Sequence, residues 1–292
     1  MTETYEALSQ RIASGERLSR GDLTQLAQAH DILSIGMLAD ELRRRVRGAR
    51  VTFVRVVCCA YDAPLTEAVP PAAREVRLTG APASLDVALT AVQTARAVAG
   101  DRLVSGFSLP DLQAVIQPGR LGAALKALRE AGLDALGELP VDRLSDPGAA
   151  LEAVGAAGFE NVRLTLSRPA AGERVDSVLR AAELGERFPF VRVINPLPMA
   201  LAPSRPTTGY EDVKLVALAR LAALPETVIQ VDWQRYGPKL AQVALTFGAD
   251  DLDNVSPSDE APEGRRRAPL EEVRRNIQAA GFEPAERDGR WP

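Results

Sequence analysis

The chain has 292 residues, of which 46% are hydrophobic and 25% are charged, and its formal net charge is −4. These values are typical of a globular protein with a large buried core, and they do not match the basic surface of nucleic-acid-binding proteins. Aromatic residues make up only 4% of the chain, which argues against a stacking platform for single-stranded nucleic acid. We therefore expect no nucleic-acid partner.

The sequence also lacks the signals of export and of membrane insertion. No charged segment followed by an apolar one opens the chain, and no run of about 18 apolar residues occurs in it. Its two cysteines, Cys58 and Cys59, are adjacent and cannot form a disulfide framework. These features predict a cytoplasmic protein without a membrane partner.

Residues 1–48 are predicted to be an N-terminal helical segment. Ser19 is placed to cap one helix, and Gly48 is placed to end another. Apolar side chains recur between them at helical spacing, at Ile32, Ile35, Leu38, Leu42 and Val46. We expect this segment to cover one end of the domain that follows.

Residues 49–292 alternate between β-branched apolar runs and amphipathic runs, joined by short links. The predicted strands cover residues 51–60, 74–80, 101–108, 133–139, 160–167, 189–198, 227–233 and 249–253. The predicted helices cover residues 84–100, 121–132, 146–158, 173–188, 210–224, 237–248 and 269–281, and residues 282–291 are predicted to be a tail.

This alternation predicts an α/β fold with a parallel sheet, and about eight units predict a TIM-like (β/α) barrel. An open, doubly wound sheet is the alternative, but no Gly-x-Gly-x-x-Gly motif follows any strand, which disfavours a dinucleotide site. Because no linker is evident, we expect one domain over residues 1–292, with the barrel over residues 49–292.

Two common kinds of catalytic site are poorly supported. His30 is the only histidine, and no Gly-x-Ser-x-Gly motif is present, so a hydrolytic triad is not expected. One histidine and two adjacent cysteines cannot supply the tetrahedral ligands of a zinc site. No metal is therefore predicted.

Three aspartates close together, Asp250, Asp251 and Asp253, form the strongest polar cluster. On a strand, Asp251 and Asp253 would face one side and Asp250 the other. Carboxylates at the end of a barrel strand suit hydrogen bonds to sugar hydroxyls, or a divalent cation, but they also cap helices and loops. The sequence leaves these alternatives open.

Other polar residues follow the ends of predicted strands, where the site of a parallel barrel lies. Asp232, Trp233 and Gln234 end one strand, and Asn195 ends another. Arg168 lies in a short loop, where its guanidinium could hold a carboxylate with two hydrogen bonds. A lid over the core is the alternative role for Asp232 and Trp233.

Three segments carry a resemblance to a known family: residues 30–48, residues 207–224 and above all residues 230–254. They resemble one group of radical SAM enzymes, which contains aminofutalosine synthase, cyclic dehypoxanthine futalosine synthase and the deazaflavin (FO) synthase subunits. The resemblance runs from about residue 17 to about residue 285. Its most specific part is Gly-Pro-Lys-x-Ala-Gln-x-Ala-Leu-x-x-Gly-Ala-Asp-Asp-Leu, residues 237–252.

The resemblance implies a cofactor site that this sequence does not carry. Such enzymes hold an iron–sulfur cluster on a Cys-x-x-x-Cys-x-x-Cys loop after the first strand, and S-adenosylmethionine completes its ligands. Here only Cys58 and Cys59 stand at that place, and the loop is short. The family's glycine-rich patch is reduced to Thr79-Gly80-Ala81. We therefore predict a vestigial loop, no cluster, no S-adenosylmethionine site and no radical chemistry.

The C-terminal half of the barrel, which contributes the substrate side of the cavity in that family, is retained. The resemblance therefore implies a nucleoside or aromatic-acid pocket and a role in menaquinone biosynthesis by the futalosine route. Catalytic candidates are Asp232, Asp251 and Asp253; candidates for binding the substrate are Asn195, Trp233, Gln234, Asp250, Asp251, Asp253 and Arg168.

Whether the protein is an enzyme stays open at this point. One alternative is a non-catalytic partner that docks on an intact radical SAM homologue, and another is a barrel with an unrelated small ligand. A pocket-forming protein should bring Asp232, Asp251 and Asn195 to one cavity, whereas a scaffold should leave them scattered.

Overall fold

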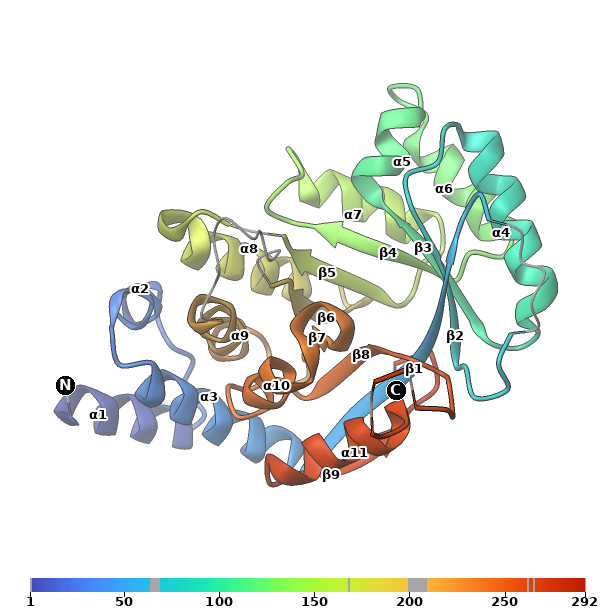
Figure 1. Ribbon diagram of the computed structural model, residues 1–292. Coiled ribbons are helices and arrows are strands. Elements are labelled where there is room, and N and C mark those ends of the chain that lie inside the picture. The colour runs from blue at the N-terminus through green and yellow to red at the C-terminus, as the bar shows by residue number, and fades with distance from the viewer. Residues whose placement is uncertain are drawn as a thin grey trace.

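The computed structural model describes residues 2–63, 69–167, 169–198, 209–261, 263–264 and 266–291 (Figure 1). Eight parallel strands close a barrel in chain order, because β1 pairs with both β8 and β2. These strands are β1 (Arg50–Ala60), β2 (Glu75–Thr79), β3 (Leu103–Ser108), β4 (Ala135–Pro140), β5 (Val162–Leu166), β6 (Val191–Pro196), β7 (Val228–Asp232) and β8 (Asp251–Val255). The predicted TIM-like barrel is confirmed, and the open sheet is wrong.

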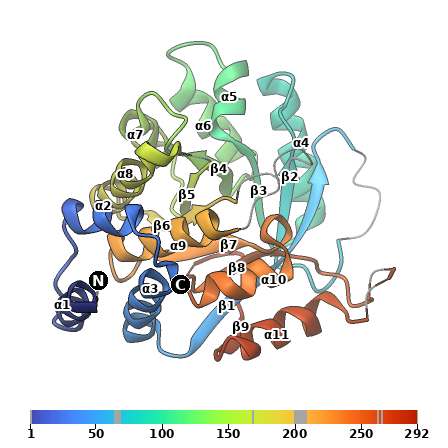
Figure 2. The same ribbon diagram turned by 60° about the vertical axis from the view of Figure 1, so that its left-hand side comes forward.

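Helices surround the barrel and follow most of its strands (Figure 2). They are α4 (Leu85–Ala99), α5 (Leu109–Val115), α6 (Leu121–Glu130), α7 (Pro147–Ala156), α8 (Arg174–Arg187), α9 (Tyr210–Ala222), α10 (Trp233–Leu245) and α11 (Pro269–Ala279). Ser84, Ser108 and Asp146 accept hydrogen bonds from backbone N–H groups at helix starts, which explains where α4, α5 and α7 begin. The short α5 was not predicted.

The N-terminal segment forms α1 (Thr2–Ala13), α2 (Arg20–Gln28) and α3 (Ile32–Arg47). Ser19 and Asp22 form a capping box at the start of α2. The segment was expected to cover one end of the barrel, but α3 packs against α9, and α2 packs against α8 and α9. It therefore adds to the outer helical layer, as Figure 1 shows at the blue end of the chain.

The C-terminal residues correct a second prediction. Residues 282–291 were expected to be an irregular tail, yet β9 (Glu283–Glu286) pairs in parallel with the first half of β1. The sequence Glu-Pro-Ala-Glu lacks the apolar pattern of a strand, so its pairing comes from the backbone of β1 rather than from its own side chains. After β9 the chain brings Arg287 into the barrel, where it contacts Asp251.

The connection between β1 and β2 is short. Residues 61–74 join the two strands, and the described part of this connection, residues 61–63 and 69–74, contains no helix. A regular (β/α) barrel places a helix after each strand, so the outer layer is one helix short beside α4 over the described residues. A groove lined by Tyr61, Val87 and Thr90 lies there.

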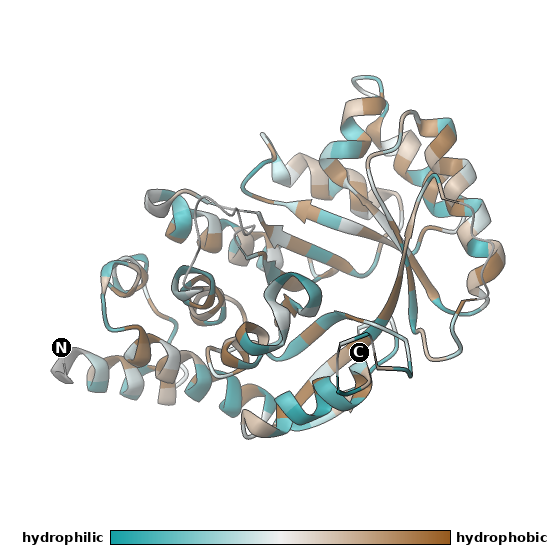
Figure 3. Ribbon diagram, viewed as in Figure 1, coloured by the Kyte–Doolittle hydropathy of each residue, from teal (hydrophilic) through white to brown (hydrophobic). Residues whose placement is uncertain are grey.

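Apolar side chains fill the space between the barrel wall and the helices, whereas the barrel interior is polar. Alternate residues of a strand face opposite sides, so one set can meet the helices while the other enters the barrel. Figure 3 shows the alternation of hydrophilic and hydrophobic residues as coloured bands along the strands. Among the described helices, none is both long and apolar enough to cross a membrane.

Candidate functional site

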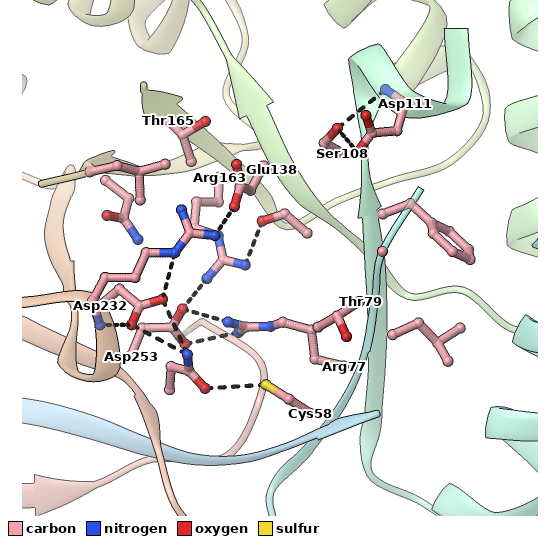
Figure 4. Close-up of a pocket in the computed structure, with 18 of the residues that line it drawn as sticks. Cys58, Arg77, Thr79, Ser108, Asp111, Glu138, Arg163, Thr165, Asp232 and Asp253 are labelled. Atoms are coloured by element: carbon pink, nitrogen blue, oxygen red, sulfur yellow. Dashed lines mark hydrogen bonds and ion pairs between the residues drawn. The ribbon is translucent and has the colours of Figure 1, made fainter. Parts of the chain in front are cut away.

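A cavity of about 330 Å³ opens where the barrel strands end (Figure 4). Its lining comes from all eight barrel strands or the residues directly after them. The polar members of this lining are Cys58, Arg77, Thr79, Ser108, Asp111, Glu138, Arg143, Arg163, Thr165, Asn195, Asp232, Arg235, Asp253 and Asn254. Ligand sites of parallel barrels lie at this end, so we take the cavity as the candidate site.

Asp253 lies at the centre of the cavity floor between two guanidinium groups. Arg77 donates to its two carboxylate oxygens at 2.8 and 2.9 Å, and Arg163 donates at 2.5 Å. Burial alone would raise the pKa of Asp253, but Arg77 and Arg163 outweigh it and hold that pKa well below its usual range. Asp253 is therefore a fixed negative charge at neutral pH.

Asp232 is a second carboxylate of the same cavity, in a different environment. Its Oδ1 accepts hydrogen bonds from the backbone N–H groups of Gln234 and Arg235, at 2.9 and 3.0 Å, and so caps α10. Burial raises the pKa of Asp232, and the negative charge of Asp253 raises it further. Two neighbouring carboxylates with opposite pKa shifts are an arrangement that suits general acid–base chemistry.

Two buried oxygens of the cavity lining have no hydrogen-bond partner within the described part of the chain. They are Thr165 Oγ1 on β5 and Asn195 Oδ1 on β6. The two residues lie opposite each other in the register of these strands. A buried polar atom without a partner costs free energy, so this pair is a natural contact for a ligand.

Two arginines lie at the mouth of the cavity. Arg235 forms ion pairs with Glu138 and Asp232. The side chain of Arg143 is exposed, and it has no ion-pair partner among the residues that the structure describes. An unpaired guanidinium at a cavity mouth can hold an anionic group with two parallel hydrogen bonds.

The positions of the two cysteines do not fit the iron–sulfur cluster of the family that the sequence resembles. Cys58 lines the cavity, whereas Cys59, the next residue of β1, packs against the apolar core outside the barrel. Over the described ranges, no group of three or more His, Cys, Asp or Glu side chains is placed to hold a metal ion. The prediction that the protein has no cluster stays a prediction.

Cys58 is expected to be an unreactive thiol. Its Sγ donates to Asn254 Oδ1 at 3.3 Å, and burial of the thiol among the residues of the cavity raises its pKa to about 11. In Cys59→Ser, Cys58 should react with iodoacetamide at pH 7.5 about a hundredfold more slowly than a free cysteine, whose pKa is about 8.5. Mass spectrometry of the labelled peptide measures the rate, which should rise steadily up to pH 10. A rate at pH 7.5 equal to that of free cysteine would contradict this.

Some residues predicted for the site meet in the cavity, and others do not. Asn195, Asp232 and Asp253 line it together. Trp233 is buried in α10, and Gln234 is exposed on that helix; neither lines the cavity. Arg168 lies outside the described residues.

The prediction that Asp250 and Asp251 bind a ligand directly needs correction, because neither lines the cavity. Asp250 faces the outside of the barrel wall, where its Oδ2 accepts hydrogen bonds from Arg220 at 2.5 Å and Arg47 at 3.2 Å. Asp251 does enter the barrel, but it is fully buried beneath the cavity and pairs with Arg287. Asp250 is thus a structural anion, and Asp251 supports the cavity from below.

Arg77, Arg163 and Thr165 supply much of the cavity floor, and none of them was predicted from the sequence. A signal was present: residues 75–79, 162–166 and 229–232 each alternate apolar and polar side chains. Strands of parallel sheets are usually apolar on both faces, so such alternation in several of them indicates a polar barrel interior. Thr165 has no stronger signal than this alternation.

No protein-family model matches the chain. Aminodeoxyfutalosine synthase of Streptomyces coelicolor is 26% identical to it, and the alignment covers 97% of this chain and 92% of that protein. The 5-amino-6-(D-ribitylamino)uracil–L-tyrosine 4-hydroxyphenyl transferase of Archaeoglobus fulgidus is 40% identical over 89 residues, 28% of this chain. The matched segment spans about a quarter of the length of such transferases.

Among solved structures, methylornithine synthase (PylB) superposes with a TM-score of 0.68 at 17% sequence identity, covering 95% of this chain and 97% of that one. This likeness shows the fold, a closed (β/α) barrel with the same overall extent. The resemblance to the radical SAM group is thus supported by the shared fold and by one distant relative along nearly the whole chain.

Proposed function

We propose that this protein is a relative of the radical SAM barrel enzymes that binds a nucleoside or an aromatic acid in the cavity. The observation that carries the proposal is the pair of buried, unpartnered oxygens, Thr165 Oγ1 and Asn195 Oδ1, beside the charged floor of Arg77, Arg163 and Asp253. Such atoms gain free energy when they form hydrogen bonds with a polar ligand.

The names of the relatives support this ligand class. The transferases are named for a ribitylamino uracil and tyrosine, a polyol-bearing heterocycle and an aromatic amino acid. The relative along the whole chain is named for aminodeoxyfutalosine. A role in menaquinone biosynthesis by the futalosine route is part of the proposal and rests on that one relative.

In the proposed function, the protein works without an iron–sulfur cluster and without S-adenosylmethionine. Support comes from the two cysteines, which lie on opposite faces of β1 and so cannot point at one cluster together. If a reaction occurs, it is a polar proton transfer, and Asp232, with its raised pKa, is the group that would hold the proton.

Ligand binding tests the proposal. We expect adenosine or 3-hydroxybenzoate to raise the melting temperature, because a ligand at a hundred times its Kd adds about 2.7 kcal/mol to the free energy of unfolding. Thr165→Val and Asn195→Leu should reduce this shift. Thr246→Val is the matched control, since the Thr246 hydroxyl donates only to a backbone carbonyl on the outside of the barrel.

Differential scanning fluorimetry and titration calorimetry give the readout. If neither compound binds, or if the two cavity variants bind as the native protein does, the proposed site is wrong. Tight binding of S-adenosylmethionine would contradict the part of the proposal that concerns the lost cofactor.

A second candidate function is a non-catalytic partner of an intact radical SAM homologue. The observation that favours it is the groove beside α4, where Val87 is 39% exposed and the described residues of the β1–β2 connection contribute no covering helix. Co-purification from native lysate separates the two functions: a partner stays bound to the homologue, and Val87→Lys weakens that complex without affecting adenosine binding.

A further inference from the structure

A chain of hydrogen bonds below the cavity determines which way the Asn195 side chain points. Asn195 Nδ2 donates to Gln230 Oε1 at 2.9 Å, and Arg163 donates to the same oxygen at 3.0 Å. Gln230 Nε2 donates to Asp251 Oδ2 at 2.8 Å. Gln230 and Asp251 are fully buried, so water does not replace any of these partners.

Both oxygens of Asp251 are surrounded by hydrogen-bond donors. Thr52 and Arg287 donate to its Oδ1, while Gln230 and Arg287 donate to its Oδ2. With two donors aimed at each oxygen, this carboxylate acts as an acceptor only. Arg287 is the residue directly after β9. It pairs with Asp251 from the end of the barrel opposite to the cavity mouth.

Gln230 lies between this acceptor and a donor. The guanidinium of Arg163 can only donate, and the carboxylate of Asp251 can only accept. Only one orientation of the Gln230 amide satisfies both, with its nitrogen toward Asp251 and its oxygen toward Arg163. That oxygen requires a donor from Asn195, so Asn195 presents its own oxygen to the cavity. The orientation thus follows from the chemistry of the partners, which is the sound basis for assigning an amide.

We propose that Asn195 Oδ1, beside Thr165, forms a subsite that accepts a hydrogen-bond donor of the ligand, and that Gln230, Asp251 and Arg287 are positioning residues that set the polarity of Asn195. This inference rests on the proposed ligand site and specifies the ligand further. A ligand with an N–H or O–H group opposite Asn195 Oδ1 is favoured, and one with only a carbonyl or ether oxygen there is rejected, because two acceptors would then face each other. The Thr165 hydroxyl can donate or accept, so it does not add to this preference.

The amide orientation is tested without any ligand. Neutron diffraction from crystals of the deuterated protein locates the deuterons of side-chain amides. We expect both deuterons of Asn195 on the atom that faces Gln230, and both deuterons of Gln230 on the atom that faces Asp251. Deuterons of Asn195 on the atom that faces the cavity would overturn the inference, whatever the protein binds.

The preference for a donor is tested with matched probes. Adenosine carries an exocyclic amine that purine riboside lacks, and 3-hydroxybenzoate carries a hydroxyl that benzoate lacks. By calorimetry, the donor-bearing member of at least one pair should bind about tenfold more tightly, and Asn195→Leu should remove the difference. Equal binding of both members in both pairs would overturn the subsite. Absence of binding by all four probes would refute the proposed function, while the neutron result still decides the orientation.

A charge swap tests the positioning residues. In Gln230→Glu two carboxylates face each other, and in Asp251→Asn the amide of Gln230 loses its fixed acceptor. Both single variants should therefore bind adenosine less tightly than the native protein. The double variant places an amide at 251 and a carboxylate at 230, which again accepts from Asn195 and Arg163. It should bind adenosine more tightly than either single variant, a coupling that independent structural damage does not produce. A double variant weaker than both singles would overturn the positioning role.

Discussion

Replacement of Asp253 by asparagine is expected to lower the free energy of unfolding by about 3–5 kcal/mol, because it leaves the largely buried guanidinium of Arg163 without its counter-charge and removes one of the two carboxylates that pair with Arg77. Asp253 is 1% exposed and accepts hydrogen bonds from both Arg77 and Arg163. Glu75 still pairs with Arg77 in the variant, but Arg163 keeps only neutral acceptors. Urea unfolding monitored by circular dichroism measures the loss, and adenosine binding should disappear with it.

Asp232→Asn is the matched control, since it changes the other carboxylate of the same cavity. Asparagine caps a helix as well as aspartate does, and burial already disfavours the charged form of Asp232. We expect its free energy of unfolding to stay within about 1 kcal/mol of the native value. Equal losses in the two variants would show that the ion pairs of Asp253 are not what stabilises the barrel interior.

The effect of Asp253 also depends on pH. Its folded-state pKa lies below the unfolded value of about 3.9, so its stabilising contribution is fully present above that value. The contribution is lost as the pH falls from about 4 through the folded-state pKa. The gap between the native protein and Asp253→Asn should therefore narrow below about pH 4. A gap that stays constant between neutral and acidic pH would contradict the ionised, paired state of Asp253.

Replacement of Asp250 by asparagine is expected to cost a similar amount, about 3–5 kcal/mol, and yet to leave the cavity unchanged. Arg220 is fully buried and depends on this carboxylate: burial lowers the pKa of Arg220, and Asp250 opposes that shift. Asp250 also accepts a hydrogen bond from the backbone N–H of Ile229, which ties β7 to the start of β8. Because it faces away from the cavity, folded Asp250→Asn should bind adenosine with a Kd within about threefold of the native value.

Arg47→Met is the control for Asp250. Arg47 pairs with the same carboxylate from a partly exposed position, with 32% of its side chain accessible, so its loss should cost about 1 kcal/mol or less. If Asp250→Asn weakens adenosine binding as strongly as Asp253→Asn does, then Asp250 belongs to the ligand site after all.

The three aspartates at the start of β8 show which side-chain directions the sequence could predict and which contacts it could not. Strand alternation correctly separated Asp250 from Asp251 and Asp253, because side chains of a strand face alternate sides whatever surrounds them. It could not show that Arg220 would meet Asp250 on the outside, or that Arg287 would meet Asp251 within. Both arginines come from distant parts of the chain, and only the closed barrel brings them to their partners.

The barrel itself was predictable because its strands are β-branched and its helices have helical periodicity and caps. The strand β9 was not, since its four residues carry no apolar face and form a strand only where β1 offers free backbone groups. Thr165 and Arg163 were overlooked for a related reason. A polar residue within an apolar run does not reveal whether it faces solvent, the core or a cavity until the sheet is closed.

Strand β1 pairs with β2, β8 and β9, and this has a consequence for how the nascent chain folds. β1 is synthesised before β8 and β9, two of its three neighbours, which lie about 200 residues further along the chain. Until Arg287 is synthesised, Asp251 has no cation to pair with, so the barrel cannot close around it without a large electrostatic cost. We therefore expect the closing step to wait until Arg287 has been synthesised, and to be slow, because the strands that it pairs lie far apart along the chain.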